Sequence, residues 1–250
     1  MSPDALPTAR GYAGEDRGAE PVKDEDGVHY PVCDNMGESV LQIDVNSLLR
    51  GLLQDYFAAT GRRCFVGSNQ FAYYERGNPR ACVSPDVYVI DEEAASQREL
   101  RSWKVWEHGG KAPTLALEVV SDEYRKDYAD ELVARYQALG VKELFRYDPE
   151  PRGRVRRTLS HFVREATGKL VERVCPPDRV YCPSYDLWLV QQADLSLRVG
   201  LGPEGAALWP TQAEARAREA EARRAAEEEL ARARAELAEL RAAQGLSSRT

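Results

Sequence analysis

The sequence predicts a mixed α/β fold, and three patterns support this prediction. A helical repeat of apolar side chains runs through residues 36–57. Residues 114–149 have the pattern of a strand, a helix and a second strand, which is the βαβ crossover that places two parallel strands in one sheet. Short alternating apolar runs then fill residues 151–200 and predict further strands.

The first part of the chain begins with a polar segment and continues with a helix and three strands. Residues 1–30 are rich in Gly, Pro, Asp and Glu, so we expect them to be disordered, because few apolar groups are available to offset the entropy lost on ordering. The helix of residues 36–57 is expected to end before Gly61. Three strands are expected next, at residues 63–67, 70–74 and 82–90. A polar loop with a short helix should follow over residues 91–112.

The middle of the chain contains the crossover. Residues 114–121 are nearly all apolar and include one carboxylate, which favours a strand buried on both faces. A helix should follow over about residues 127–139 and stop at Gly140. Residues 142–149 form the second strand, which ends in a turn.

The last segment, residues 211–245, is dominated by Ala, Glu, Arg and Leu and predicts one long charged helix. Five apolar residues in it alternate four and three apart, as in the seam of a coiled coil: Ala226, Leu230, Ala233, Leu237 and Leu240. This seam covers barely two heptads. The alternative is a solvated single helix held by Glu–Arg pairs one turn apart. The sequence is therefore compatible with a homodimer and with a lone helix.

Composition and charge narrow the class of protein. The net charge is −7, whereas nucleic-acid binders are normally basic, although acidic metal sites and solvated tails can add negative charge away from a binding face. No apolar run is long enough to span a bilayer, and the N-terminus lacks signal-peptide features, so we expect a cytoplasmic protein with no membrane partner. The cysteines form no CxxC pair, which argues against a zinc site and a disulfide framework. Serine-hydrolase and P-loop motifs are absent, and we expect no small-molecule cofactor.

Two carboxylates, Asp86 and Glu118, are the strongest candidates for chemistry. Each lies in or beside an apolar strand, where an unpaired charge is costly. Two carboxylates on neighbouring strands can together bind a hard divalent cation such as Mg²⁺. The alternative is that Asp86 caps a turn and Glu118 forms a buried ion pair.

An ordered series of short motifs across residues 36–149 resembles one family of nucleases. The motifs are Met36-Gly37-Glu38, Gly67-Ser68-Asn69, Tyr73-Tyr74-Glu75-Arg76-Gly77-Asn78-Pro79, Ser84-Pro85-Asp86-Val87, Leu117-Glu118-Val119-Val120-Ser121, and Tyr136 followed by Leu139-Gly140-Val141-Lys142-Glu143-Leu144. Together these residues resemble the Uma-type restriction endonucleases, a bacterial branch of the PD-(D/E)XK nuclease superfamily. A weaker similarity continues through the β-rich region and the C-terminal helix.

The resemblance implies a restriction-endonuclease-like fold, in which helices flank a central mixed sheet. We expect this domain to span residues 31–200, with a core of residues 36–150 and a β-rich extension of residues 151–200. The polar segment of residues 1–30 precedes the domain, and the charged helix of residues 211–245 follows it.

The resemblance also implies a metal site for Mg²⁺ or Mn²⁺ formed by Asp86 and Glu118. In this superfamily the residue after the second carboxylate, here Val119, offers its backbone carbonyl to the metal. Glu38 matches a helix carboxylate that often completes the site. An alternative role for Glu38 is that of an acidic residue favoured at the N-terminus of a helix by the helix dipole.

The lysine of the family pattern has no direct match. The superfamily pattern would place it at Val120, and Uma-type proteins carry it on the following helix, where this chain has Leu132. Lys126, at the start of the same helix, is the nearest candidate for this catalytic role, and Arg125 is a second. The alternative for Lys126 is an ordinary solvated lysine in a loop.

The resemblance predicts a metal-dependent endonuclease that hydrolyses DNA. Lys126 would orient the attacking water or offset the negative charge of the transition state. The alternative is an inactive nuclease fold that serves as a binding or assembly module through its C-terminal helix. The missing lysine and the net charge of −7 favour this alternative.

Overall fold

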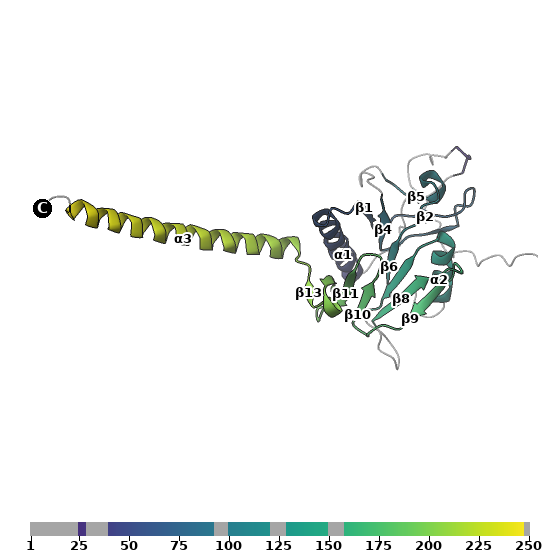
Figure 1. The fold of residues 1–250 in the computed structure, drawn as a ribbon. Coiled ribbons are helices and arrows are strands. Elements are labelled where there is room, and N and C mark those ends of the chain that lie inside the picture. Colours follow the sequence, from purple (N-terminus) through teal and green to yellow (C-terminus); the bar gives the residue numbers. More distant parts are fainter. Residues whose placement is uncertain (1–24, 29–39, 93–99, 121–128, 150–157, 248–250) are drawn as a thin grey trace, which may run out of the picture. The chain divides into compact units, whose positions relative to one another are not determined.

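The structure is a computed structural model, and it describes residues 25–28, 40–92, 100–120, 129–149 and 158–247. The chain divides into two compact units. Unit 1 spans Met1–Trp209 and contains the sheets, and unit 2 spans Pro210–Thr250 and contains one long helix (Figure 1). The expected disordered segment of residues 1–30 lies, apart from residues 25–28, outside the described residues.

A six-stranded mixed sheet forms the centre of unit 1, in the strand order β1-β4-β6-β7-β8-β9 (Figure 1). Its strands are β1 (Cys64–Gly67), β4 (Val87–Asp91), β6 (Leu115–Val119), β7 (Glu143–Tyr147), β8 (Leu159–Arg164) and β9 (Leu170–Arg173). Strands β6 and β7 are parallel, and the other neighbours are antiparallel. Helix α2 (Ala129–Leu139) connects β6 to β7, and Gly140 ends it with a φ of 98°. The predicted βαβ crossover is therefore confirmed.

Alternate residues of β6 face different helices, because successive side chains of a strand point to opposite faces. Leu115 and Leu117 pack in one hydrophobic cluster with Leu49 and Leu53 of helix α1 (Val40–Ala59). Ala116 packs in a second cluster with the buried apolar side chains of α2. Helices α1 and α2 thus cover opposite faces of the sheet, and the prediction of a mixed sheet flanked by helices is confirmed.

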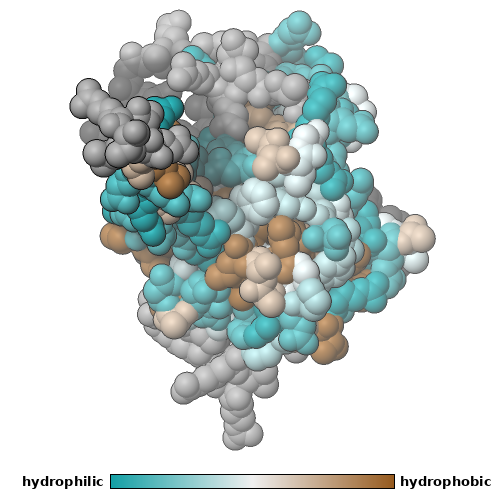
Figure 2. Space-filling model, turned by 60° about the vertical axis from the view of Figure 1, so that its left-hand side comes forward, coloured by the Kyte–Doolittle hydropathy of each residue, from teal (hydrophilic) through white to brown (hydrophobic). Residues whose placement is uncertain are grey.

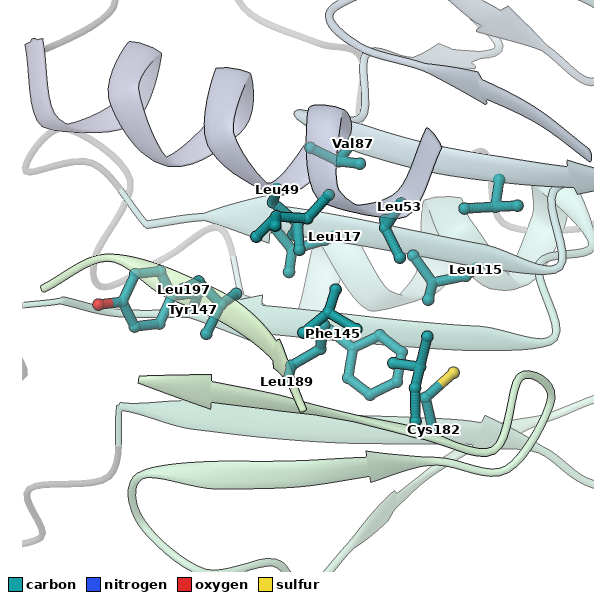
Figure 3. Packing of buried hydrophobic residues seen from close by; sticks show 14 of the residues in the cluster. Leu49, Leu53, Val87, Leu115, Leu117, Phe145, Tyr147, Cys182, Leu189 and Leu197 are labelled. Carbon is teal, nitrogen blue, oxygen red and sulfur yellow. The ribbon is translucent and has the colours of Figure 1, made fainter. Parts of the chain in front are cut away.

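A second, four-stranded antiparallel sheet packs in the first cluster and contacts α1 directly. It contains β10 (Arg179–Cys182), β11 (Leu187–Gln191), β12 (Leu197–Leu201) and β13 (Ala207–Leu208). Figure 3 shows Leu189 of this sheet beside Phe145 of β7 and Leu197 beside Tyr147, below the leucines of α1. Burying such a side chain contributes about 1.5–3 kcal/mol. The β-rich region that follows the core therefore contributes to two sheets. Strands β8 and β9 extend the central sheet, and β10 to β13 form the second sheet.

A buried polar link joins the two sheets at Glu143 of β7, which is 2% exposed. Its Oε2 lies 2.8 Å from Nε2 of His161, and its Oε1 accepts a 2.9 Å hydrogen bond from the backbone N–H of Ser184, beyond β10. The His161 ring stacks on Phe145 with a centroid distance of 4.4 Å. Burial alone would raise the pKa of Glu143, but the hydrogen bonds from His161 and Ser184 outweigh it and lower the pKa.

The prediction of one strand over residues 82–90 is wrong. Strand β3 (Cys82–Val83) belongs to a small sheet with β2 (Ala72–Tyr73) and β5 (Trp103–Lys104), whereas β4 belongs to the central sheet. Pro85 lies between them and has no N–H to donate to a ladder, so it interrupts the strand. The short helix expected in residues 91–112 is present as η1 (Val105–His108), but β5 was not predicted.

Unit 2 contains α3 (Gln212–Ser247), which confirms the predicted long helix. Its start is fixed by two reciprocal hydrogen bonds. Thr211 Oγ1 accepts from the backbone N–H of Glu214 at 3.1 Å, and Glu214 Oε2 accepts from the backbone N–H of Thr211 at 2.8 Å. This capping box satisfies two donors that a helix leaves unpaired at its start.

The described residues expose both hydrophilic and large hydrophobic side chains. On the face shown in Figure 2, hydrophobic side chains gather in small groups among hydrophilic ones. The exposed large hydrophobic side chains of the described residues are Val40, Ile43, Val174, Tyr181, Leu230, Leu237 and Leu240. Within the described parts of the chain, no helix combines the length and the hydrophobicity that crossing a bilayer requires.

Candidate functional site

Asp86 and Glu118 lie side by side at the ends of two neighbouring strands. Strands β4 and β6 are antiparallel, and their register pairs Val87 with Leu117. Asp86 and Glu118 are the next residues along these strands, so the register brings the two carboxylates to one place. The expectation that they lie on neighbouring strands is confirmed.

The Asp86 carboxylate is held by three hydrogen-bond donors and is only 4% exposed. Its Oδ1 accepts from Nε2 of Gln42 at 2.8 Å and from Nδ2 of Asn46 at 3.0 Å. Its Oδ2 accepts from the backbone N–H of Val119 at 2.6 Å. The carboxylate is therefore fixed by a helix on one side and by the adjacent strand on the other.

Local structure explains why these donors meet Asp86. Gln42 and Asn46 are four residues apart on α1, so they point from the same face of the helix. The Ser68 hydroxyl donates a 2.6 Å hydrogen bond to the backbone carbonyl of Asp86, and the backbone N–H of Asn69 donates to the carbonyl of Pro85 at 2.9 Å. These bonds hold the segment before β4 in place, although Pro85 prevents it from continuing the strand.

Glu118 is partly buried and faces α2 and β7. The Tyr136 hydroxyl of α2 donates a short hydrogen bond to Oε1 of Glu118. The parallel register of β6 and β7 pairs Glu118 with Arg146, which places the two side chains on the same face of the sheet. The positive charge of Arg146 therefore lies beside the Glu118 carboxylate.

Both carboxylates bind protons more readily than usual. Burial raises the pKa of Asp86, and the hydrogen bonds from Val119, Gln42 and Asn46 offset only part of this effect. Burial and the neighbouring Asp86 charge raise the pKa of Glu118 well above its usual value, despite the opposing influence of Tyr136 and Arg146. The described groups of the protein thus balance the two negative charges incompletely.

A divalent cation fits this pair, because it would balance both charges and bind the oxygen ligands that Mg²⁺ and Mn²⁺ prefer. Asn46 offers a further oxygen. Asn46 is 2% exposed, and its Oδ1 has no hydrogen-bond partner among the described residues. Within the same residues, no group of three or more His, Cys, Asp or Glu side chains is placed to hold a metal. The candidate ligands among the described residues are therefore two carboxylates with an amide oxygen nearby.

The family of the chain follows from a comparison with protein-family models. The model described as "Uma2: Putative restriction endonuclease" matches residues 36–191, which is more than half of the chain. The chain belongs to the Uma2 family. This match confirms the resemblance found in the sequence, and it includes both carboxylates of the site.

The Uma2 chain is also similar to a solved structure, described as a putative nuclease belonging to DUF820 from Anabaena variabilis ATCC 29413. The two chains are 13% identical with a TM-score of 0.41, and the similarity covers 63% of this chain and 78% of the other. No curated protein matches the chain.

Two of the predicted site residues lie outside the described residues. These are Glu38, in residues 29–39, and Lys126, in residues 121–128, which also contain the second candidate Arg125. Their proposed roles stay predictions. Val119 is described, and its N–H binds Asp86, while the metal-binding role of its carbonyl stays a prediction.

Leu132, at the position of the family lysine, is 5% exposed and packs in the hydrophobic cluster of α2. It lies one turn before Tyr136, so both side chains point from the same face of the helix. The chain therefore has a buried apolar side chain at the position where the resemblance implies a lysine.

Sequence reasoning missed the polar residues that surround the carboxylates. Gln42 and Asn46 occur in an otherwise amphipathic helix, and only the fold brings them to Asp86. Arg146 could have been found, because it is the one cation in the apolar strand Leu144-Phe145-Arg146-Tyr147. A charged side chain in a buried strand requires a partner, for the same reason that singled out Glu118.

Proposed function

We propose that this Uma2 protein is a metal-dependent endonuclease that hydrolyses phosphodiester bonds of DNA. Asp86 and Glu118 would bind Mg²⁺ or Mn²⁺, with the Val119 carbonyl and Glu38 completing the site. Membership of a family described as restriction endonucleases supports the reaction class. The observation that carries the proposal is the pair of adjacent carboxylates whose charges are not balanced by the described protein groups.

The chain's own residues have defined tasks in this reaction. A bound divalent ion would polarise the scissile phosphate and lower the pKa of a coordinated water. The three donors to Asp86 hold its carboxylate in position, so little reorganisation is needed when the ion binds. The Tyr136 hydroxyl holds Glu118 in the same way.

The positive charge near the phosphate has two candidate sources. The sequence indicates Lys126, which precedes α2 by three residues in the chain. Arg146 is the described alternative, since the register places it beside Glu118. A guanidinium stays protonated and can form paired hydrogen bonds with phosphate oxygens, so Arg146 would offset charge in the transition state and would not act as a base.

The distribution of charge is less unfavourable for DNA than the net value of −7 implies. Residues 1–30 contain seven acidic and three basic side chains, and residues 210–250 contain eight of each. More than half of the excess negative charge therefore lies in the N-terminal segment, and the α3 unit contributes none. The remainder of unit 1 is only weakly acidic, which permits a local basic surface for the backbone of DNA.

The test is cleavage of supercoiled plasmid and single-stranded DNA by the purified chain in Mg²⁺ and in Mn²⁺. Asp86→Asn and Glu118→Gln should each abolish metal-dependent cleavage, and Glu172→Gln, which changes an exposed carboxylate of β9, should not. Mn²⁺ should also raise the Tm of the wild type and of Glu172→Gln but not of the other two variants, because binding to the native state adds stability. Cleavage by Glu118→Gln at the wild-type rate would contradict the assignment.

Leu132 favours a second candidate function, because a buried apolar side chain stands where the resemblance implies the catalytic lysine. The chain would then be an inactive nuclease fold that binds or assembles with other molecules. The two functions predict different results in the same experiment. An inactive fold with an intact metal site shows the Mn²⁺ effect on Tm without cleavage, whereas an active enzyme shows both.

A further inference from the structure

Helix α3 exposes a row of large hydrophobic side chains. Every side chain from Gln212 to Ala243 is exposed within unit 2. Leu230, Leu237 and Leu240 are 51%, 48% and 55% exposed, whereas most other leucines of the described residues are buried or partly buried. A regular row of exposed leucines on a long helix requires a partner to remove it from water.

The spacing of the row matches a coiled-coil seam. Leu230 and Leu237 are seven residues apart and occupy the a positions of a heptad, while Ala226, Ala233 and Leu240 occupy the d positions. The five side chains form one narrow stripe along α3. Such a stripe is suited to a second helix with the same repeat.

The charges beside the stripe favour one partner and one orientation. Glu229 and Glu236 occupy the g positions, and Arg234 and Arg241 occupy the e positions. In a parallel, in-register pair of identical helices, each g residue faces the e residue five positions later on the other helix. Glu229 then faces Arg234 of a second copy, and Glu236 faces Arg241. In an antiparallel pair, g residues face g residues, which would bring Glu against Glu and Arg against Arg.

The first half of α3 is unsuited to pairing. The same frame places Arg216, Glu219 and Arg223 at a and d positions, where charges are costly. Arg223 Nε instead donates a 2.9 Å hydrogen bond to Oε1 of Glu227 on the same helix, as expected of a solvated segment. Pairing is therefore confined to residues 226–241.

We propose that α3 forms a parallel, in-register coiled coil with α3 of a second copy over residues 226–241. Parallel pairing brings the two helix starts to the same end of the coiled coil. Two copies of unit 1 are then attached at that end, each through its own Pro210–Thr211 connection. This assembly goes beyond the nuclease proposal and does not depend on it.

Sedimentation of the full-length chain tests the assembly. The wild type should sediment as a dimer whose dissociation constant rises at least tenfold in the double variant Glu229→Arg with Glu236→Arg. The variant Arg234→Glu with Arg241→Glu should be weakened similarly, and mixing the two variants should restore the dimer. Glu228→Arg with Glu239→Arg makes the same change of charge outside the seam and should leave the dimer intact. Far-ultraviolet circular dichroism checks that each variant is folded.

Disulfide cross-linking tests the orientation. A thiol introduced by Ala226→Cys lies in the seam opposite its own counterpart only in a parallel pair, so it should form a covalent dimer on oxidation. Ala225→Cys places a thiol on the outer face and is the matched control, and the wild type gives the background from the native cysteines. A wild type that is monomeric at its highest soluble concentration, or a dimer unaffected by the Glu229 and Glu236 reversals, would overturn the proposal. Equal cross-linking of the two thiols would overturn the parallel register.

Discussion

The backbone N–H of Val119 donates a 2.6 Å hydrogen bond to Oδ2 of Asp86, so the strand that carries one carboxylate directly holds the other. Val119 follows Glu118 on β6, and β6 is a central strand of the sheet. The position of Asp86 is therefore set by the sheet before any ion binds. The raised pKa values of Asp86 and Glu118 give the site several measurable properties.

Glu118→Gln is expected to stabilise the metal-free protein at neutral pH. The pKa of Glu118 is raised well above 4.5 in the folded state, mainly by burial and by Asp86, so ionising Glu118 lowers the free energy of unfolding. This cost is absent below about pH 4.5 and grows as the pH rises toward the folded-state pKa. In EDTA at pH 7 to 8 the variant should melt a few degrees above the wild type. A change of about 1 kcal/mol in the free energy of unfolding shifts the Tm of a chain of this length by roughly 2–4 °C.

The difference in Tm should shrink as the pH falls below 5, and Mn²⁺ should reverse its sign, because the wild type gains a ligand that the variant cannot bind. A variant that melts below the wild type at every pH in EDTA would show that Glu118 is not destabilised by its ionisation.

Glu143→Gln is expected to have the opposite effect at neutral pH. The pKa of Glu143 is lowered in the folded state, because the hydrogen bonds from His161 and Ser184 outweigh the effect of burial. The ionised carboxylate therefore stabilises the fold at neutral pH, and this contribution is lost as the pH falls through the folded-state pKa. The variant should lose about 1.5–3 kcal/mol of unfolding free energy at pH 7 in urea titrations.

The loss caused by Glu143→Gln should be smaller at pH 4 than at pH 7, whereas the metal dependence of Tm should be unchanged, since Glu143 lies away from the candidate metal ligands. A loss that is independent of pH would indicate that packing at Glu143, and not its charge, stabilises the junction of the two sheets.

Arg146→Met is expected to reduce metal-dependent cleavage by about 10–100-fold, because it removes the positive charge beside Glu118. The acidic limb of the pH profile of cleavage should also move to higher pH, because Arg146 lowers the pKa of Glu118. Arg146→Lys keeps the charge and should retain part of the rate and the position of the limb. If both variants cleave like the wild type with unchanged pH profiles, Lys126 becomes the stronger candidate for the charge near the phosphate.

Leu132→Lys restores a positive charge at the family position and is expected to raise cleavage about tenfold or more, since a positioned cation or proton donor contributes at least this much in hydrolytic enzymes. The side chain shares the face of α2 that carries Tyr136, whose hydroxyl reaches Glu118. The variant should lose about 2–3 kcal/mol of unfolding free energy, because a buried leucine is removed. Leu132→Met, which adds length without charge, is the control and should not raise cleavage.

The sequence was sufficient to predict the elements whose pattern is local. The helical repeat of α1 and the strand, helix and strand around Glu118 appear directly in the order of apolar residues. Asp86 and Glu118 were identified because a carboxylate in an apolar strand is costly, whatever the rest of the fold does. The break at Pro85 was missed because the apolar residues on both sides resemble one continuous strand.

The surroundings of the carboxylates could not be predicted in the same way. Gln42 and Asn46 are 44 and 40 residues from Asp86 along the chain, so their contact depends on how α1 packs on the sheet. The neighbourhood of Glu118 and Arg146 depends on strand register, and a shift of one residue would point Arg146 to the opposite face. The register of β6 and β7 depends on how the whole core packs, so neither strand sequence alone predicts it.

The capping box at Thr211 and Glu214 allows α3 to begin without any contact from another domain. Both hydrogen bonds that begin the helix come from residues next to it in the chain, and neither requires a contact with unit 1. A segment that carries its own starting signal can be joined to an unrelated domain, or exchanged for a helix with different pairing charges, without redesigning the junction. Changing the four charged side chains at the e and g positions would then redirect the choice of partner while unit 1 stays the same.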